Sequence, residues 1–125
     1  MIELPAGLAG DVGGCEKETL SQAAQRELQE ETGYECREMI QLTEGPPSSG
    51  LSSEIITFFE ARGLRRTGSG GGHGGEKIIV HEVPLGQVDS WLHRITVEGI
   101  LWVDPKVYTG LYFIRVRGGF FCNNF

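Results

Sequence analysis

The sequence predicts a single mixed α/β domain in which helices and a sheet form layers. Segments with the helical spacing of apolar residues alternate along the chain with short runs rich in β-branched and aromatic residues. A chain of 125 residues can bury one modest core but not two, and no segment is repeated. We therefore expect residues 1–125 to fold as one domain.

The first expected elements are a short strand at residues 2–4 and a long helix at residues 19–32. Thr19 and Gln22 have the spacing of a capping box, in which each side chain binds a free backbone amide at the helix start. Gly33 suits the left-handed position that ends a helix. An apolar stripe repeats every four residues along the helix and consists of Leu20, Ala24 and Leu28.

Two strands are expected in the middle of the chain. Residues 55–61 and 77–83 are rich in β-branched and aromatic side chains, and Pro84 ends the second run. Between them, residues 64–76 include a run of glycines that predicts a flexible loop. The glycine run has no lysine and no hydroxyl residue in the register of a phosphate-binding loop, so it does not predict a phosphate cradle.

Two helices are expected toward the end of the chain. The first has apolar residues at helical spacing, at Leu85, Val88, Trp91 and Leu92. The second follows Asp104, an N-cap, and Pro105, which is favoured in a first turn. Its apolar positions are Val107, Leu111 and Ile114. Residues 115–125 are predicted to be an apolar tail that docks either on the domain or on a partner chain.

Composition and charge exclude several partners. The net charge is -6 and the basic residues form no long run, so a nucleic acid is not expected to bind. No window is apolar enough to span a membrane, and the first residues do not resemble a secretion signal. Reduced thiols in a cytoplasm are the simplest account of the three cysteines, Cys15, Cys36 and Cys122.

The histidines and tryptophans are expected to be structural. No metal-binding spacing relates the three histidines, His73, His81 and His93. Trp91 lies on an apolar helix face and Trp102 lies near the Asp104 cap. Both tryptophans are therefore expected in the core rather than stacked on a nucleotide base.

Three carboxylates are concentrated on the first helix. At 3.6 residues per turn, Glu30 and Glu31 lie one turn beyond Glu27. Like charges at this spacing repel, which suggests that a cation is bound between them. Mg²⁺ prefers oxygen ligands and takes one or two carboxylates together with substrate phosphates. A solvated acidic helix face is the alternative, and the surrounding residues decide between the two.

The surrounding residues resemble the Nudix box, the signature of the Nudix hydrolases. The matching positions are Glu18, Arg26, Glu27, Leu28, Glu30, Glu31 and Gly33, with Tyr34 at the final, usually aliphatic, position. Residues 3–7, Glu-Leu-Pro-Ala-Gly, resemble the branch of the family that cleaves ADP-ribose and related nucleoside diphosphate sugars. The resemblance implies an α/β/α sandwich with a mixed sheet.

The resemblance also implies roles for the residues of the box. Mg²⁺, for which Mn²⁺ could substitute, would be held by the backbone carbonyl of Ala6 and the side chains of Glu27, Glu30 and Glu31. The residues that support the site would be Gly7, Glu18, Arg26 and Gly33. Arg26 and Glu18 would pair and orient the ligand carboxylates, although an ordinary surface salt bridge is the alternative.

One departure from the box lies between Gly7 and Glu18, where ten residues stand instead of five. Val12 occupies the position at which the box has glycine. The turn-forming residues 10–14 therefore predict a small loop insertion, with Gly7 as the box glycine. A distorted loop would misplace the carbonyl of Ala6.

The general base is expected at Glu76. Residues 76–80 resemble a pattern of ADP-ribose hydrolases in which the glutamate activates the attacking water, and a flexible loop would let Glu76 reach that water. Lys77 stands where an acid is common, and a polar residue at a strand edge is the alternative interpretation of Glu76. The other candidates for the base are Glu30, Glu44 and Glu82.

Residues 47–54 resemble a loop that lines the substrate cleft in similar proteins. The pattern there is Pro-Ser-Pro-Gly, then a small hydroxyl residue and a glutamate, and Ser49 replaces the second proline in this chain. Ser52 and Glu54 are the expected substrate-binding residues. A plain turn before the next strand is the alternative.

The predicted function is Mg²⁺-dependent hydrolysis of the diphosphate bond of ADP-ribose or a related nucleoside diphosphate sugar. The alternatives are hydrolysis of nucleoside triphosphates or dinucleoside polyphosphates, and a catalytically impaired nucleotide-binding or interaction module. In relatives of this branch, strands that precede the segment corresponding to residues 3–7 complete the sheet and often carry the dimer contact. We therefore expect a domain without its leading strands, for which a homodimer is a candidate assembly.

Overall fold

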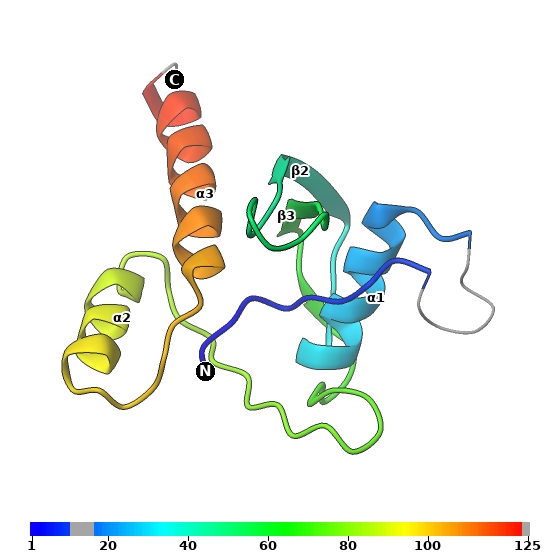
Figure 1. The fold of residues 1–125 in the computed structure, drawn as a ribbon, viewed down its shortest axis with the longest axis horizontal. Coiled ribbons are helices and arrows are strands. Elements are labelled where there is room, and N and C mark those ends of the chain that lie inside the picture. The colour runs from blue at the N-terminus through cyan, green and yellow to red at the C-terminus, as the bar shows by residue number, and fades with distance from the viewer. Residues whose placement is uncertain (11–16, 124–125) are drawn as a thin grey trace.

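The computed structural model describes residues 1–10 and 17–123 (Figure 1). Its elements in chain order are α1 (Leu20–Thr32), β1 (Tyr34–Glu35), β2 (Glu38–Gly45), β3 (Ile56–Arg62), β4 (Arg65–Arg66), α2 (Val88–Val97) and α3 (Pro105–Asn123). Most of the loop insertion predicted at residues 10–14 lies outside the described residues, as does Cys15.

The strands form two antiparallel pairs with helices on either side of the larger one. β2 pairs with β3 from Glu38, opposite Arg62, to Gly45, opposite Ile56, and β1 pairs with β4. Both α1 and α3 contact these two longer strands, and Figure 1 shows the β2–β3 pair between the two helices. This arrangement confirms the predicted α/β class and its order of helix, sheet and helix.

Two predicted strands are not formed as expected. Residues 77–83 are irregular, and Ile79 is 80% exposed. A strand requires a hydrogen-bonded neighbour, and none of the described strands pairs with this segment, so its β-rich composition is not sufficient. Residues 2–4 contribute only a single parallel bridge, between Ile2 and Val103.

Helix α1 begins and ends where the sequence predicts. The capping box is present, with the Gln22 amide 3.1 Å from Thr19 Oγ1 and the Thr19 amide 2.9 Å from Gln22 Oε1. Gly33 has φ +78°, and its amide donates to the carbonyl of Gln29 at 2.9 Å. The apolar stripe is wrong at its first position, because Leu20 is 52% exposed and the buried residue of α1 is Ala23.

The hydrophobic core lies between α2 and α3. Val88, Leu92 and Val107 form its buried cluster, and it is surrounded by partly buried Ile2, Val83, Trp91, Val103 and Leu111. Trp91 therefore lies in the core as predicted. The expectation for Trp102 is wrong, because its side chain is 85% exposed on the turn before α3 while its backbone carbonyl accepts from the Ile2 amide at 2.7 Å.

The two later helices differ from their predicted bounds. Residues 85–87 form a turn, so α2 starts at Val88 rather than at Leu85. Helix α3 starts behind the predicted cap, where Asp104 Oδ1 accepts from the Lys106 amide at 2.9 Å. The helix then continues to Asn123, so it includes most of residues 115–125, which were predicted to be a tail.

Ion pairs join α3 to the other layers. Arg117 pairs with Glu60 on β3, and Arg115 lies 2.8 Å from Asp89 on α2.

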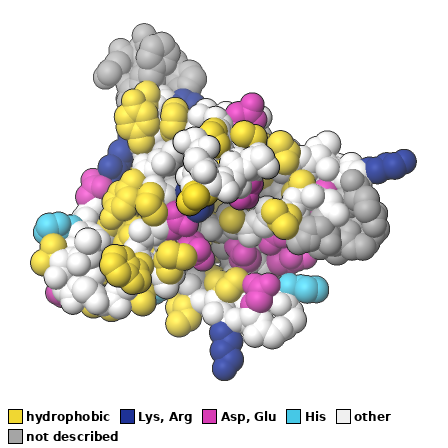
Figure 2. All heavy atoms as spheres, in the orientation of Figure 1, with side chains coloured by type: hydrophobic (Ala, Val, Ile, Leu, Met, Phe, Trp, Pro, Cys, Tyr) yellow, Lys and Arg dark blue, Asp and Glu magenta, His cyan; other side chains and the backbone are white. Residues whose placement is uncertain are grey.

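Within the described part of the chain, no helix has both the length and the apolar character that a membrane span requires. Figure 2 shows the face of the molecule seen in Figure 1. Hydrophobic side chains are concentrated over α2 and α3 on this face, whereas acidic side chains gather near its middle, beside α1.

Candidate functional site

The N-terminal segment lies directly against the acidic side of α1. The amide of Ala6 donates to Glu31 Oε2 at 3.1 Å. At Gly7, an added Cβ would lie 2.1 Å from Cδ and Oε1 of Glu27, so a larger residue there would displace the Glu27 side chain from its present position. The predicted box glycine and two of the predicted metal ligands are therefore brought together by the fold, across 20 or more residues of sequence.

Arg26 joins the support residues to the predicted ligands. Its guanidinium lies 2.8 Å from Glu18 Oε1, 2.7 Å from Glu27 Oε1 and 3.5 Å from Glu30 Oε2. It also donates to the carbonyl of Leu8 at 3.2 Å. Only 9% of the Glu18 side chain is exposed, compared with 16% of that of Arg26. This network is more than the isolated surface salt bridge that the sequence left open as an alternative.

The charges of this network shift two pKa values in opposite directions. The hydrogen bond from Arg26, followed by one from the Gly10 amide, holds the pKa of Glu18 below its usual 4.5. The hydrogen bond to Glu18 is also the main reason that the pKa of Arg26 is raised. Both groups are therefore charged at neutral pH, and each stabilises the charged form of the other.

Replacing Arg26 by Gln is expected to destabilise the protein in a pH-dependent way. Because the pKa of Glu18 is lowered in the folded state, the pair contributes stability above about pH 4.5 and loses it as the pH falls through the folded-state pKa. Arg26→Gln should therefore lower the melting temperature at pH 7 and have a smaller effect at pH 3. Thermal unfolding at the two pH values measures this.

Arg115→Gln is the matched control, because its pair with Asp89 is exposed on both sides and should contribute little. Equal melting temperatures for wild type and Arg26→Gln at pH 7 would contradict the structural role of Arg26.

Glu31 has no cation to balance its charge among the described residues. Its pKa is raised, first by partial burial and then by the charges of Glu27, Glu76 and Glu3, while the Ala6 amide opposes the shift. The charge of the predicted base, Glu76, therefore acts on the predicted ligand Glu31. Glu3 also belongs to this group. No motif in the sequence points to it, because only the fold brings residue 3 close to residue 31.

The chemistry of these donors fits a divalent cation. The group contains carboxylate oxygens only, which is the preference of Mg²⁺, and the pKa of Glu31 is raised first by burial and then by the charges of the neighbouring acids. Among residues 1–10 and 17–123, no three His, Cys, Asp or Glu side chains converge into a ready-made metal cage. Glu27 instead pairs with Arg26.

Comparison with known proteins decides the family. The NUDIX domain model matches residues 3–98, which is most of the chain and includes α1 with its carboxylates. The chain belongs to the Nudix family. It is also 41% identical over 66 residues to a methanol dehydrogenase activator from Bacillus methanolicus. That alignment covers 53% of this chain and 33% of the relative, so the chain spans about a third of the relative's length.

The remaining predicted residues of this Nudix domain make no hydrogen bond or ion pair with the carboxylates of α1 within the described structure. Ser52 Oγ accepts from the Glu54 amide at 3.0 Å in an exposed turn before β3, as the plain-turn alternative predicts. Neither side chain is hydrogen-bonded or ion-paired to Glu27, Glu30 or Glu31 in the described structure. Their role in substrate binding stays a prediction.

The two reserve candidates for the base have other surroundings. Glu82 Oε1 accepts from the Tyr34 hydroxyl at 2.6 Å and lies 3.7 Å from the guanidinium of Arg66. This hydrogen bond is the main reason that the pKa of Tyr34 is raised. Glu44 is exposed near the end of β2. Of the loop and strand glutamates proposed as base, Glu76 is the one whose charge acts on Glu31.

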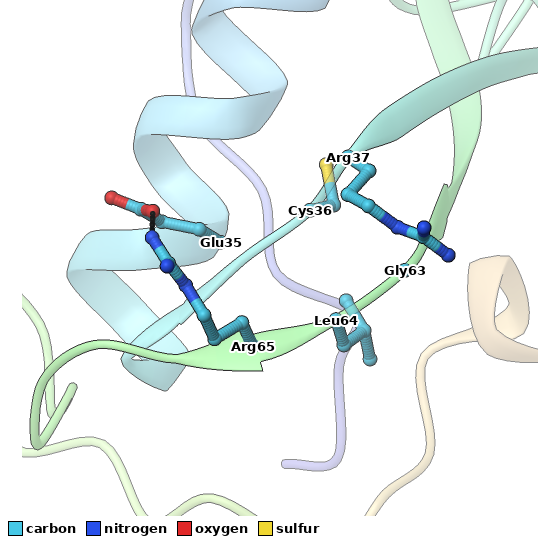
Figure 3. Close-up of a pocket in the computed structure, with 6 residues that line it drawn as sticks. All are labelled: Glu35, Cys36, Arg37, Gly63, Leu64 and Arg65. Carbon is cyan, nitrogen blue, oxygen red and sulfur yellow. Dashed lines mark hydrogen bonds and ion pairs between the residues drawn. The ribbon is translucent and has the colours of Figure 1, made fainter.

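A hollow of about 580 Å³ lies beside the β1–β4 pair (Figure 3). It is lined by Glu35, Cys36, Arg37, Gly63, Leu64 and Arg65. Arg65 lies 3.1 Å from Glu35, and Figure 3 shows Arg37 directed away from this pair. None of the predicted metal or base residues lines it, so the hollow does not define the candidate active site.

Proposed function

We propose that this Nudix domain hydrolyses the diphosphate bond of ADP-ribose or a related nucleoside diphosphate sugar in the presence of Mg²⁺. The products would be a nucleoside monophosphate and a sugar phosphate. The observation that carries the proposal is the uncompensated charge of Glu31 beside Glu27 and Glu76. A domain without catalysis would gain stability by losing one of these mutually repelling carboxylates, so their presence together favours a bound cation.

Each residue of the group would have a separate task. Glu27, Glu30 and Glu31 would hold Mg²⁺, which supplies charge neutralisation at the diphosphate and lowers the pKa of a bound water. Glu76 would accept the proton of the attacking water. Arg26 orients Glu27 and Glu30 through the contacts described above, and the Ala6 amide holds Glu31.

The second candidate function is a nucleotide-binding module that acts on another protein instead of turning over substrate. Two observations favour it. The relative from Bacillus methanolicus is described as an activator of methanol dehydrogenase, and Lys77 stands beside the proposed base. Hydrolysis of nucleoside triphosphates or dinucleoside polyphosphates remains the alternative within the enzyme class, because the carboxylates would contact only metal and diphosphate.

Calorimetric titration separates the two candidate functions. ADP-ribose is titrated into the protein with Mg²⁺, and the cell contents are then analysed by anion-exchange chromatography. An enzyme gives heat that continues after each injection, and AMP accumulates. A binding module gives heat that saturates, and ADP-ribose is recovered intact, which would reject hydrolysis of this substrate.

A further inference from the structure

The glycine-rich segment after β4 wraps around the end of α1 that carries the proposed metal ligands. The last four carbonyls of a helix have no partner within the helix. In α1, the carbonyl of Glu31 accepts from the Gly71 amide at 2.8 Å, and the carbonyl of Glu30 accepts from the Gly72 amide at 3.0 Å. The glycine run predicts a flexible loop here, and no pattern in the sequence indicates these hydrogen bonds.

A second set of contacts ties the same segment to the residue that ends the helix. The amides of Thr67 and Gly68 both donate to the carbonyl of Gly33, at 2.8 Å and 3.1 Å. We call residues 67–72 the latch. Its amides satisfy carbonyls at the C-terminal end of α1, so the backbone of two proposed metal ligands is fixed by the latch as well as by the helix.

The latch also reaches the proposed base. The amide of Ile78 donates back to the carbonyl of Gly71 at 3.3 Å, so the two ends of the short loop that carries Glu76 meet at the latch. At Gly72, an added Cβ would lie 2.8 Å from both Cβ and Oε2 of Glu76. Glu76 therefore packs against the residue whose amide is bonded to the Glu30 carbonyl.

Glycine is required where the latch touches the helix. Gly70 has φ +66°, and an added Cβ would lie 2.5 Å from the carbonyl carbon of Thr32 and 2.7 Å from the carbonyl oxygen of Glu31. Both obstacles are backbone atoms, which cannot rotate away as the end of a side chain can. Gly75 differs in each respect, because its φ is not positive and an added Cβ would meet open space.

We infer that the latch, centred on Gly70, positions Glu76 against the metal-binding end of α1 for hydrolysis. This inference rests on the proposed function for its catalytic consequence, but the latch itself can be observed without activity. Gly70 is thus a positioning residue that acts through Glu76. The glycines of the segment serve close backbone approach and the left-handed conformation, rather than flexibility alone.

The test uses Gly70→Ala, with Gly75→Ala as the matched control, in the full chain labelled with ¹⁵N. Gly70→Ala should abolish the slow exchange of the Gly71 and Gly72 amides and the nuclear Overhauser effect between Gly72 Hα and Glu76 Hβ. Gly75→Ala should keep both. Slow exchange that persists in Gly70→Ala would overturn the latch, whether or not the wild type hydrolyses any substrate.

The role of Gly70 in positioning Glu76 for catalysis is tested by a double-mutant cycle with Glu76→Gln. Gly70→Ala should lower kcat for ADP-ribose roughly 10²-fold, the loss expected when a catalytic group is displaced by about 1 Å, with KM nearly unchanged. In the Glu76→Gln background it should cause no further loss. Equal losses in both backgrounds, or an unchanged kcat in the single variant, would overturn the positioning role.

A second variant covers the case in which Gly70→Ala does not fold. Gly72 has φ +94°, so Gly72→Ala is also strained, but its Cβ would collide with the side chains of Glu76 and Ile78 rather than with the helix backbone, and it should therefore displace Glu76. The same non-additive loss with Glu76→Gln is expected, and additive losses would again reject the inference. A wild type that hydrolyses nothing would reject the proposed function, and the exchange measurement would still decide the latch.

Discussion

Replacing Glu31 by Gln should remove most of the magnesium-dependent turnover and at the same time stabilise the metal-free protein. Glutamine keeps an oxygen for the Ala6 amide but removes the negative charge. A metal supplies several kcal/mol of transition-state stabilisation and each ~1.4 kcal/mol is a factor of ten, so turnover should fall by about 10³-fold. Initial rates at saturating Mg²⁺ and a calorimetric Mg²⁺ titration measure the loss.

The stability effect of Glu31→Gln follows from the direction of its pKa. The pKa of Glu31 is raised in the folded state by burial and by neighbouring acids, so its ionisation costs stability as the pH rises through that value. Without metal, the variant should therefore melt at a higher temperature than wild type at pH 8, and the difference should shrink below about pH 4.5. A variant that melts lower at pH 8 would contradict the description of Glu31.

Replacing Glu76 by Gln should lower kcat and leave Mg²⁺ affinity nearly unchanged. A positioned general base contributes about 10²- to 10⁴-fold, so a loss in that range is expected, with KM for ADP-ribose close to the wild-type value. Steady-state kinetics over a range of Mg²⁺ concentrations separates the two parameters.

Glu82→Gln is the matched control for the base, because Glu82 is held by Tyr34 and Arg66 and its charge is not among those that raise the pKa of Glu31. It should leave kcat unchanged. If Glu82→Gln lost turnover and Glu76→Gln did not, the base would have to be reassigned to Glu82.

The parts of this fold that depend on local interactions were predictable from the sequence. The capping box of Thr19 and Gln22, the left-handed Gly33 and the Asp104 cap all depend on residues a few positions apart. The family resemblance added the pairing of Arg26 with Glu18, which the structure shows at 2.8 Å. Sequence spacing alone would not separate this network from a surface salt bridge.

The predictions that were wrong or missing concern residues whose structure depends on neighbours distant in sequence. Residues 77–83 have strand composition, but none of the described strands pairs with them. Trp102 has the size of a core residue, yet the core between α2 and α3 forms without it. The latch could not be predicted from the sequence either, because a run of glycines indicates flexibility until the helix that it approaches is known.

Phosphorus NMR of ADP-ribose incubated with the protein and Mg²⁺ tests the central claim most directly, with Glu31→Gln in a parallel tube. The account predicts resonances of AMP and ribose 5-phosphate from the wild type and an unchanged diphosphate signal from the variant. Equal product from both proteins would contradict a metal site that depends on Glu31. An intact diphosphate with wild type, across ADP-ribose and related nucleoside diphosphate sugars, would contradict the proposed hydrolysis.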